Sequence, residues 1–477
     1  MSKYISDFNE IIAILEAQYE NLAVSNNEYL CAIDKITADI DNGCLKERGE
    51  FLRDLFLADG NAKILLSELY EKSCKHHRCE TCSLSKYCNA RIQELIDNVD
   101  DSALTMVDLF CGAGGLSLGF SQEGFAVSLA NDIEPCCIDT YSHNHPETPR
   151  KHIVLGDINN VIENIDNLLR FKNVDVVVGG PPCQGFSMAN RQRLIDDPRN
   201  ILYKSYVKVV SIVQPKFFVM ENVKGMQSVA SQVIEDFNRI GYNVDCRVFN
   251  AKDYGVPQSR ERLIFVGNKI GMDSSKILEE IDLISTTFDY YTLADALFGL
   301  RPLMALKQKN ATELDTIESG RKIEKNNTEA ESKYLSLINC GKKCNLTFNH
   351  KARYNNDRDI EIFGRLNQGD NSNDPKIADI MPYARRNGIF KDKYFKLEES
   401  KVCKTITAHM KFDCNMYIHP TQARGLTPRE AARVQSYPDD YYFRGAYTKT
   451  YMQIGNSVPP LLGRAIAKII KSHLRGV

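Results

Sequence analysis

The sequence contains no run of about 18 apolar residues, the length that a membrane-spanning helix requires. Its opening residues, MSKYISDFNE, also lack the apolar segment of a secretory signal. These absences argue against a membrane-spanning or exported protein, and we expect a cytoplasmic protein with no membrane partner. A hydrophobic share of 43% and a charged share of 26% over 477 residues are typical of a globular chain with two or three domains.

The chain carries little net charge, −2 in total, but that charge is unevenly distributed. Residues 1–100 contain 11 basic and 18 acidic side chains, a balance of −7, whereas residues 301–425 contain 23 and 16, a balance of +7. A polyanion would be attracted to the second region and not to the first. An ordinary surface of mixed charge is the alternative interpretation.

The first hundred residues indicate a helical extension with a candidate metal site. Apolar residues between positions 4 and 73 recur at the spacing of one helical face. With 15 cysteines and no export signal, reduced thiols are favoured over disulfides. Four thiolates could bind a structural Zn²⁺ or an iron–sulfur cluster, and a cysteine-rich loop without metal is the alternative. These four are Cys74, Cys79, Cys82 and Cys88.

A strand, a glycine-rich turn and a helix start are predicted at Leu104–Phe120, LTMVDLFCGAGGLSLGF. Glycines let a ligand approach the backbone, and a helix N-terminus attracts a negative group. The next strand, Ala126–Ala130, leads to Asp132, and a carboxylate at the end of a second strand can accept from ribose hydroxyls. Asp157 follows a third short strand, where a strand-end turn or a helix cap is the alternative.

The apolar run Val176–Val178 predicts a buried parallel strand that breaks at Gly179-Gly180-Pro181-Pro182 and presents Cys183. Ligands gather beyond the carboxyl ends of such strands, so we expect Cys183 at the mouth of an α/β sheet. Its thiolate would be a nucleophile, and a small buried hydrophobe is the alternative.

Two further segments supply charged groups near this mouth. Glu221 follows the predicted strand Lys216–Met220, where a carboxylate suits acid–base chemistry. Gln258, Arg260 and Arg262 alternate, so an extended chain would place them on one face. Two guanidinium groups on one face are costly unless they meet anions or carbonyls, and an exposed charged face is the alternative.

Seven or more segments between residues 103 and 475 resemble, in the same order, the cytosine-C5 DNA methyltransferases of bacterial restriction–modification systems. The first hundred residues lie outside this resemblance. The matching segments include DLFCGAGGLSLGF (108–120), PPCQGFS (181–187), ENV (221–223), QSRER (258–262), LTPREAARVQSYP (426–438) and QIGNSVPP (453–460).

The resemblance implies an α/β fold, a doubly wound Rossmann-like methyltransferase sheet with a smaller target-recognition domain and an N-terminal helical extension. Residues 1–100 would form the extension, 103–271 the catalytic core, 272–425 the target-recognition region and 426–477 the return into the core.

The resemblance also implies a DNA (cytosine-5-)-methyltransferase. It would transfer a methyl group from S-adenosylmethionine to C5 of a flipped-out cytosine in a specific DNA sequence, through a covalent Cys183–C6 adduct. The catalytic residues it implies are Cys183, Glu221, Arg260 and Arg262. The residues it implies for cofactor binding are Phe110, Gly112, Gly114, Gly115, Asp132, Ile133, Asp157, Ile158, Gly180 and Asn456.

Double-stranded DNA is the expected partner, with a cognate restriction endonuclease as a second one. We expect a monomer that associates with the nucleoid through DNA. Two alternatives stay open: an RNA cytosine methyltransferase of similar fold, and a DNA-binding regulator without catalysis. The long basic segment argues against the first, and the presence of Cys183, Glu221 and the glycine turn argues against the second.

Overall fold

The computed structural model describes residues 93, 96–97, 99, 102–145, 147–182, 201–311, 316–325, 332–342, 344, 346–382 and 393–476. The predicted helical extension, apart from four of its positions, lies outside the described residues. So do Cys183 and the four cysteines of the candidate metal site, Cys74, Cys79, Cys82 and Cys88.

A seven-stranded sheet forms the centre of the larger part of the molecule, with the strand order β3-β2-β1-β4-β5-β7-β6. The neighbours from β3 to β5 pair in parallel, and β7 pairs antiparallel with both β5 and β6. This topology confirms the predicted doubly wound α/β fold. The strands are β1 (Leu104–Leu109), β2 (Phe125–Asp132), β3 (Ile153–Leu155), β4 (Val176–Gly179), β5 (Phe217–Val223), β6 (Asn243–Asn250) and β7 (Glu261–Asn268).

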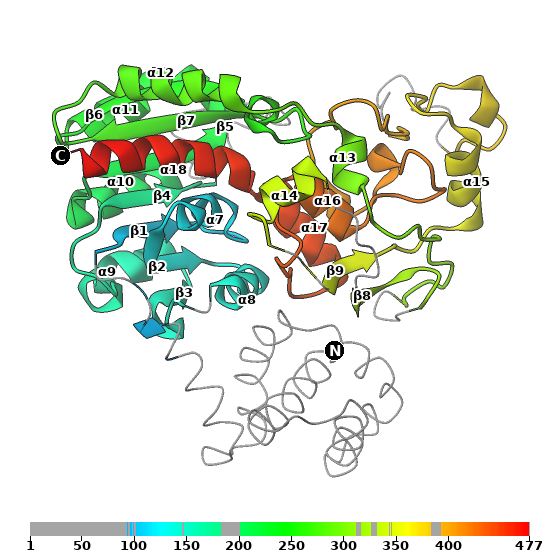
Figure 1. The fold of residues 1–477 in the computed structure, drawn as a ribbon, viewed down its shortest axis with the longest axis horizontal. Helices are drawn as coiled ribbons and strands as arrows, with labels where there is room; N and C mark the ends of the chain where they lie inside the picture. Colours follow the sequence, from blue (N-terminus) through cyan, green and yellow to red (C-terminus); the bar gives the residue numbers. More distant parts are fainter. Residues whose placement is uncertain are drawn as a thin grey trace, which may run out of the picture.

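Helices cover both faces of this sheet (Figure 1). Because successive strand residues point to opposite faces, Val176 and Val178 of β4 join one hydrophobic cluster and Val177 joins the other. The helices on the Val177 side are α9 (Ile158–Leu168), α10 (Ile201–Val213) and α11 (Ala230–Asn238). The helices on the opposite side are α7 (Gly115–Gln122), α8 (Pro135–Asn144), α12 (Ser274–Ile284) and α18 (Pro460–Arg475).

Helix α12 packs on the seven-stranded sheet, directly after the domain boundary predicted at residue 271. The Ser274 hydroxyl donates to the carbonyl of Asn243 on β6 at 2.8 Å. Arg247 of β6 pairs with Asp282 of α12 at 3.1 Å. These two contacts hold α12 against β6.

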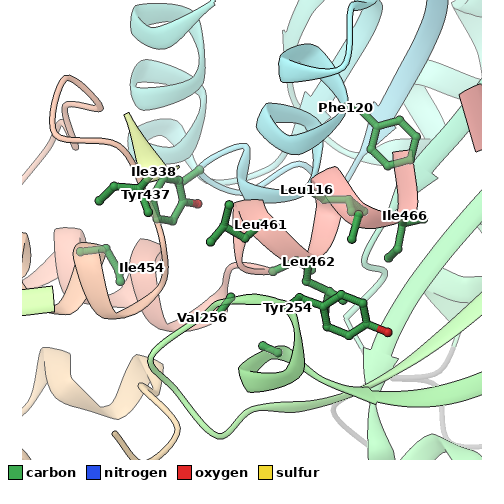
Figure 2. Close-up of a cluster of buried hydrophobic side chains, with 14 of the residues drawn as sticks. Leu116, Phe120, Tyr254, Val256, Ile338, Tyr437, Ile454, Leu461, Leu462 and Ile466 are labelled. Carbon is green, nitrogen blue, oxygen red and sulfur yellow. The ribbon is translucent and has the colours of Figure 1, made fainter. Parts of the chain in front are cut away.

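The C-terminal helix α18 closes the core by crossing α7 at very short range. A Cβ at Gly119 of α7 would overlap the backbone of Arg464 and lie 2.5 Å from the carbonyl oxygen of Pro460. Only glycine permits this approach. Around the crossing, Figure 2 shows side chains from both helices packed in one cluster, namely Leu116, Phe120, Leu461, Leu462 and Ile466.

A smaller part lies beside the carboxyl edge of the sheet and is built around a two-stranded antiparallel ribbon (Figure 1). Its regular elements are α13 (Leu293–Leu297), β8 (Gly320–Lys325), α14 (Lys333–Ile338), β9 (Leu346–Lys351), α15 (Asp357–Arg365), α16 (Pro428–Val434) and α17 (Tyr447–Asn456). Short 3-10 turns complete the chain: η1 (Arg150–His152), η3 (Lys224–Val229), η4 (Ala251–Tyr254), η5 (Ser285–Thr287), η6 (Pro375–Ile377), η8 (Ala408–Lys411) and η9 (Asn415–Tyr417).

Helix α16 starts with the capping box that its sequence predicts. The Thr427 hydroxyl accepts from the Glu430 backbone N–H, and the Glu430 carboxylate accepts from the Thr427 N–H at 2.7 Å. The same carboxylate receives two hydrogen bonds from Arg424, at 2.6 and 2.8 Å, inside the protein. Burial disfavours the charged carboxylate, but Arg424 outweighs this effect and lowers the pKa of Glu430.

A second charged residue of α16 joins the helix to the small sheet. The buried Arg429 guanidinium donates to the carbonyls of Phe348, at 2.7 Å, and of Pro438, at 2.9 Å. Since Phe348 lies on β9, this side chain fixes the ribbon to the segment that returns into the catalytic core. No helix in the described part of the chain is long and apolar enough to cross a membrane.

Candidate active site

The glycine turn predicted as a ligand loop lies at the carboxyl end of β1. Phe110, Gly112 and Gly114 all have positive φ angles, 55°, 54° and 77°. A side chain at Gly112 would meet no atom within 4 Å, so the space above this backbone is open. For Phe110 a positive φ is strained, and such strain is typical of functional loops.

Residues of the C-terminal segment 426–477 pack against the other side of this glycine turn. A Cβ at Gly114 would lie 2.8 Å from the Tyr441 hydroxyl, and one at Gly115 would lie 2.7 Å from the Tyr437 hydroxyl and overlap the carbonyl of Val458. Glycine is therefore required at these two positions by packing, while Gly112 faces free space.

Asp132 ends β2 beside the glycine turn. Its Oδ2 accepts from the Gly112 N–H and its Oδ1 from the Glu134 N–H, both at 2.8 Å. Burial raises the pKa of this carboxyl group above its usual range. Each oxygen keeps a further lone pair, so the carboxylate can still accept from two hydroxyls.

Ile133 presents an unusual surface directly after this carboxylate. Its side chain is 66% exposed, although its neighbours in β2 are mostly buried. Leu155 at the end of β3 is also exposed, and it pairs with Asp132 in the sheet. Together the two side chains offer an apolar platform beside a hydrogen-bonding carboxylate.

Asp157 and Ile158 begin α9 at the same edge. Asp157 is exposed and caps the helix by accepting from the Asn159 N–H at 2.8 Å, which is the helix-cap alternative suggested by the sequence. Ile158 is buried in the core cluster below the sheet, so a ligand would meet its backbone and not its side chain.

The segment leading to Cys183 is held at the ends of β4 and β5. The Asn222 side chain donates to the carbonyl of Pro181 at 3.0 Å inside the protein. A Cβ at Gly180 would lie 2.8 Å from Glu221 Oε2. Any larger residue at position 180 would therefore displace this carboxylate. Cys183 itself lies outside the described residues, two positions beyond Pro181.

Glu221 and Arg262 form an ion pair at this edge. Arg262 Nε lies 2.7 Å from Glu221 Oε1, and both side chains are largely buried. Antiparallel pairing of β5 with β7 sets Val223 opposite Arg262, which brings the two charged side chains to one face. The sequence predicted both groups, and the structure places them in direct contact.

Arg260, two residues earlier, has different surroundings. It is 1% exposed, and its guanidinium donates to the carbonyls of Ile406, at 2.6 Å, and of Gly455 and Ser457, both at 2.8 Å. Burial lowers the pKa of this group well below its usual range. Because its surroundings are the protein's own carbonyls, Arg260 positions other segments and does not face a substrate.

In the sequence, Asn456 lies between Gly455 and Ser457, two of the residues whose carbonyls accept from Arg260. It is exposed at the end of α17, whereas its neighbours Gly455 and Ser457 are buried and accept from Arg260. Ser457 also lies against Gly115 of the glycine turn. The tertiary structure therefore brings Asn456 beside the turn, although most of the chain separates them.

The profile of the C-5 cytosine-specific DNA methylase family matches residues 104–472, from the start of β1 into α18. The chain belongs to this family. It is a DNA cytosine methyltransferase, and the predicted enzyme class is thereby confirmed.

Several methyltransferases are similar to this one over most of its length. The Type II methyltransferase M1.HphI of Haemophilus parahaemolyticus is 36% identical over 385 residues, which cover 77% of this chain and 87% of the relative. M.XorII of Xanthomonas oryzae pv. oryzae is 37% identical over 391 residues, or 77% and 85%. A prophage-encoded DNA modification methyltransferase of E. coli, solved by crystallography, has a TM-score of 0.60 at 26% identity and covers 78% of this chain and 100% of its own.

Two contributions to the methyltransferase site were not predicted from the sequence. Asn222 was expected only as part of a triplet, but its amide fixes the segment before Cys183. Gln258 accepts from the Ile406 N–H at 2.7 Å and donates to Gln435 Oε1 at 2.7 Å, linking three distant segments. No group of three His, Cys, Asp or Glu side chains suited to a metal occurs among the described residues.

Proposed function

We propose that this methyltransferase transfers the methyl group of S-adenosylmethionine to C5 of a cytosine that has been extruded from duplex DNA, through a covalent bond between Cys183 and C6. The observation that supports this most directly is the Glu221–Arg262 pair at 2.7 Å, next to the segment that leads to Cys183. A carboxyl group and a guanidinium held together match the N3 and O2 edge of a cytosine.

The cofactor side has the shape and polarity that S-adenosylmethionine requires. The open space over Gly112 admits the methionine part, whose carboxylate suits the N-terminus of α7. Asp132 would accept from the ribose hydroxyls, and Ile133 would pack on adenine. Phe110, Gly114 and Gly115 shape the turn.

The remaining predicted cofactor contacts lie around this site. Asp157, the Ile158 backbone and Gly180 would border it at the strand ends, and Asn456, exposed at the end of α17, would contact the cofactor from the other side. When bound, S-adenosylmethionine supplies an electrophilic methyl group.

The protein residues prepare cytosine for this transfer. The Cys183 thiolate adds to C6, forming the sulfur–carbon bond and pushing an electron pair through the ring towards N3 and O2. Glu221 stabilises N3 by a hydrogen bond or proton, and Arg262 stabilises O2. C5 would then take the methyl group, with cleavage of its bond to the sulfonium sulfur and S-adenosylhomocysteine as the leaving group. Loss of the C5 proton to a base from solvent would return the electron pair that expels the Cys183 thiolate. Arg260 serves as a positioning residue.

Cytosine C5 and C6 are not accessible inside a stacked duplex, so the base must leave the helix. We further propose that the region predicted at residues 272–425 binds the recognised sequence, because residues 301–425 carry a net charge of +7. The Type II names of the relatives support pairing with a restriction endonuclease and action on chromosomal DNA. A structural metal at Cys74–Cys88 and a monomeric state stay predictions.

The test is methylation of mixed-sequence duplex DNA with labelled S-adenosylmethionine, followed by sequencing that locates 5-methylcytosine. We expect the label at C5 within one recurrent motif, and none with Cys183→Ser. A separate tRNA sample is the control for substrate class. Label in tRNA alone, or equal label with Cys183→Ser, would contradict the proposal.

A further inference from the structure

The turn η8 displays an aromatic ring that the methyl-transfer chemistry does not use. Phe412, directly after η8, is 65% exposed, whereas Met410 and Cys414 on either side are buried. Single exposed apolar side chains are common on protein surfaces, so exposure alone indicates nothing. The surroundings of Phe412 are what distinguish it.

The buried side of this turn is held by the side chain of Arg353. The Arg353 guanidinium donates to the carbonyls of Met410 and Phe412, both at 2.9 Å. Arg353 itself lies over the Tyr451 ring of α17, 5.9 Å from the ring centre. The ring of Phe412 is therefore presented to solvent by a fixed support.

The other side of η8 packs against the helix that carries Asn456. A Cβ at Gly455 would overlap the backbone of Thr407 and Ala408, so the two segments touch directly. This packing ties the position of the turn to the core of the methyltransferase and not only to the smaller part.

A lysine and a histidine flank the exposed ring. Lys411 Nζ lies 4.8 Å from the centre of the Phe412 ring, and the His409 ring lies 5.3 Å from it. Asp413 is the nearest acidic neighbour in the sequence, and its carboxylate accepts from the Asn415 N–H at 3.1 Å within the following turn. A flat apolar surface beside positive charge is complementary to a nucleic acid, which offers base faces next to phosphates.

The segment before the turn runs beside the active site. The Thr405 hydroxyl donates to the carbonyl of Ser259 at 2.6 Å, and Arg260 donates to the carbonyl of Ile406 at 2.6 Å. Ser259 and Arg260 directly precede Glu261 and Arg262, the first residues of β7. DNA that places a cytosine against Arg262 would therefore pass close to η8.

We propose that Phe412 stacks on a base left unstacked where the target cytosine leaves the helix, at the border of the active site, while Lys411 and His409 lie against the neighbouring phosphates. This inference rests on the proposed function and adds a residue that binds DNA without taking part in the chemistry. Stacking is tolerant of sequence because every base has an aromatic face, so Phe412 contributes affinity rather than base choice.

The test measures binding of fluorescent duplex DNA to the full chain over a series of salt concentrations. Two duplexes are used, one carrying the methylated motif and one with the same composition in scrambled order. The variants are Phe412→Ala, Phe412→Tyr and Lys411→Gln. Tyr290→Ala is the matched control, because Tyr290 is also a highly exposed aromatic, at 64%, and lies outside this cluster.

We expect Phe412→Ala to weaken binding of the motif duplex about tenfold, in the range that base–aromatic stacking gives, with an unchanged salt dependence. Binding of the scrambled duplex, in which no base is flipped out, should stay within about twofold of the wild type. Phe412→Tyr should restore binding to within about twofold of the wild type, because its ring stacks equally well. Lys411→Gln should reduce the slope of log K against log salt by about 0.9, the effect of one lost phosphate contact. Tyr290→Ala should bind like the wild type.

The inference would be overturned if Phe412→Ala bound the DNA as tightly as Tyr290→Ala and the wild type do. It would also be overturned if both variants lost affinity tenfold, because the loss would then not be specific to Phe412. Thermal unfolding of each variant separates loss of fold from loss of contact. Methylation by the wild type is measured independently, so an enzyme that methylates DNA without dependence on Phe412 refutes only this inference. A wild type that binds DNA through Phe412 but transfers no methyl group refutes only the proposed function.

Discussion

Arg260 Nη2 donates to the carbonyl of Ser457 at 2.8 Å, across 197 positions of the sequence. The bond joins the segment that carries Arg262 to the segment that borders the glycine turn. One guanidinium thus connects the side of the site that would hold cytosine with the side that would hold the cofactor.

Replacing Arg260 with methionine should lower the free energy of unfolding by about 3 kcal/mol, because buried carbonyls of Ile406, Gly455 and Ser457 lose their donors. Urea unfolding of the full chain measures the change. Arg239→Met is the control, since Arg239 is exposed directly after α11 and its replacement should change stability by less than about 0.5 kcal/mol. A similar small change for Arg260→Met would contradict the positioning role.

Glu221→Gln should reduce the rate of methyl transfer about 10²- to 10³-fold, because an amide cannot supply a proton to N3. The affinity for duplex DNA should change little. Single-turnover methylation with labelled cofactor measures the rate, and Glu235→Gln on the exposed side of α11 is the matched control. A Glu221→Gln enzyme with the wild-type rate would exclude acid catalysis by this group.

Ile133→Ser should weaken cofactor binding about tenfold, because covering the sec-butyl side chain of isoleucine with adenine contributes about 1.5 kcal/mol. Isothermal titration with S-adenosylmethionine gives the dissociation constant. Leu283→Ser on α12 removes an equally exposed apolar side chain away from the glycine turn and should leave binding unchanged. Equal constants for wild type and Ile133→Ser would mean that adenine lies elsewhere.

Gly119→Ala should destabilise the protein by more than about 2 kcal/mol, because the new methyl group would overlap the backbone of α18. Gly364→Ala in α15 is the matched control. There a Cβ meets no atom within 4 Å, so alanine should raise helix stability by up to about 1 kcal/mol. Thermal unfolding of both variants tests the close crossing of α7 and α18, and equal midpoints would argue against it.

Acid should destabilise the protein through His350 and His419. Burial lowers the pKa of each to about 4, below the unfolded value of about 6.5. Between these values the unfolded chain binds protons that the folded chain does not, so each histidine removes about 1.4 kcal/mol per pH unit as the pH falls. Buried Asp108, whose pKa is raised to about 7, acts in the opposite direction in the same window.

Comparison with a variant isolates the histidine contribution. Urea unfolding of the wild type and of His419→Asn is followed from pH 7 to pH 4.5, and the variant should show the shallower loss of stability. Glu430 does not interfere, because its lowered pKa makes its stabilisation constant until the pH falls below the unfolded carboxyl value of about 4.3. Parallel curves for the two proteins would contradict this assignment.

The sequence by itself determined the elements whose signals are local. The apolar run at Val176–Val178 forms β4 as expected, and the Thr-x-x-Glu pattern at Thr427 and Glu430 forms a capping box at the start of α16. Buried parallel strands are recognisable because both of their faces are apolar, and β4 fits this pattern. The family motifs further named Glu221, Arg262 and Asp132 as site residues, since their chemistry is tied to loops at strand ends.

Only the tertiary structure distinguished residues that look alike in the sequence. Arg260 and Arg262 occupy alternate positions of one segment, yet the first is enclosed by backbone carbonyls and the second pairs with Glu221. Ile133 is exposed and Ile158 is buried, although both follow an aspartate at a strand end. These differences depend on contacts with segments that are distant in the sequence, such as Ile406, Gly455 and Ser457 for Arg260, and no local pattern encodes these contacts.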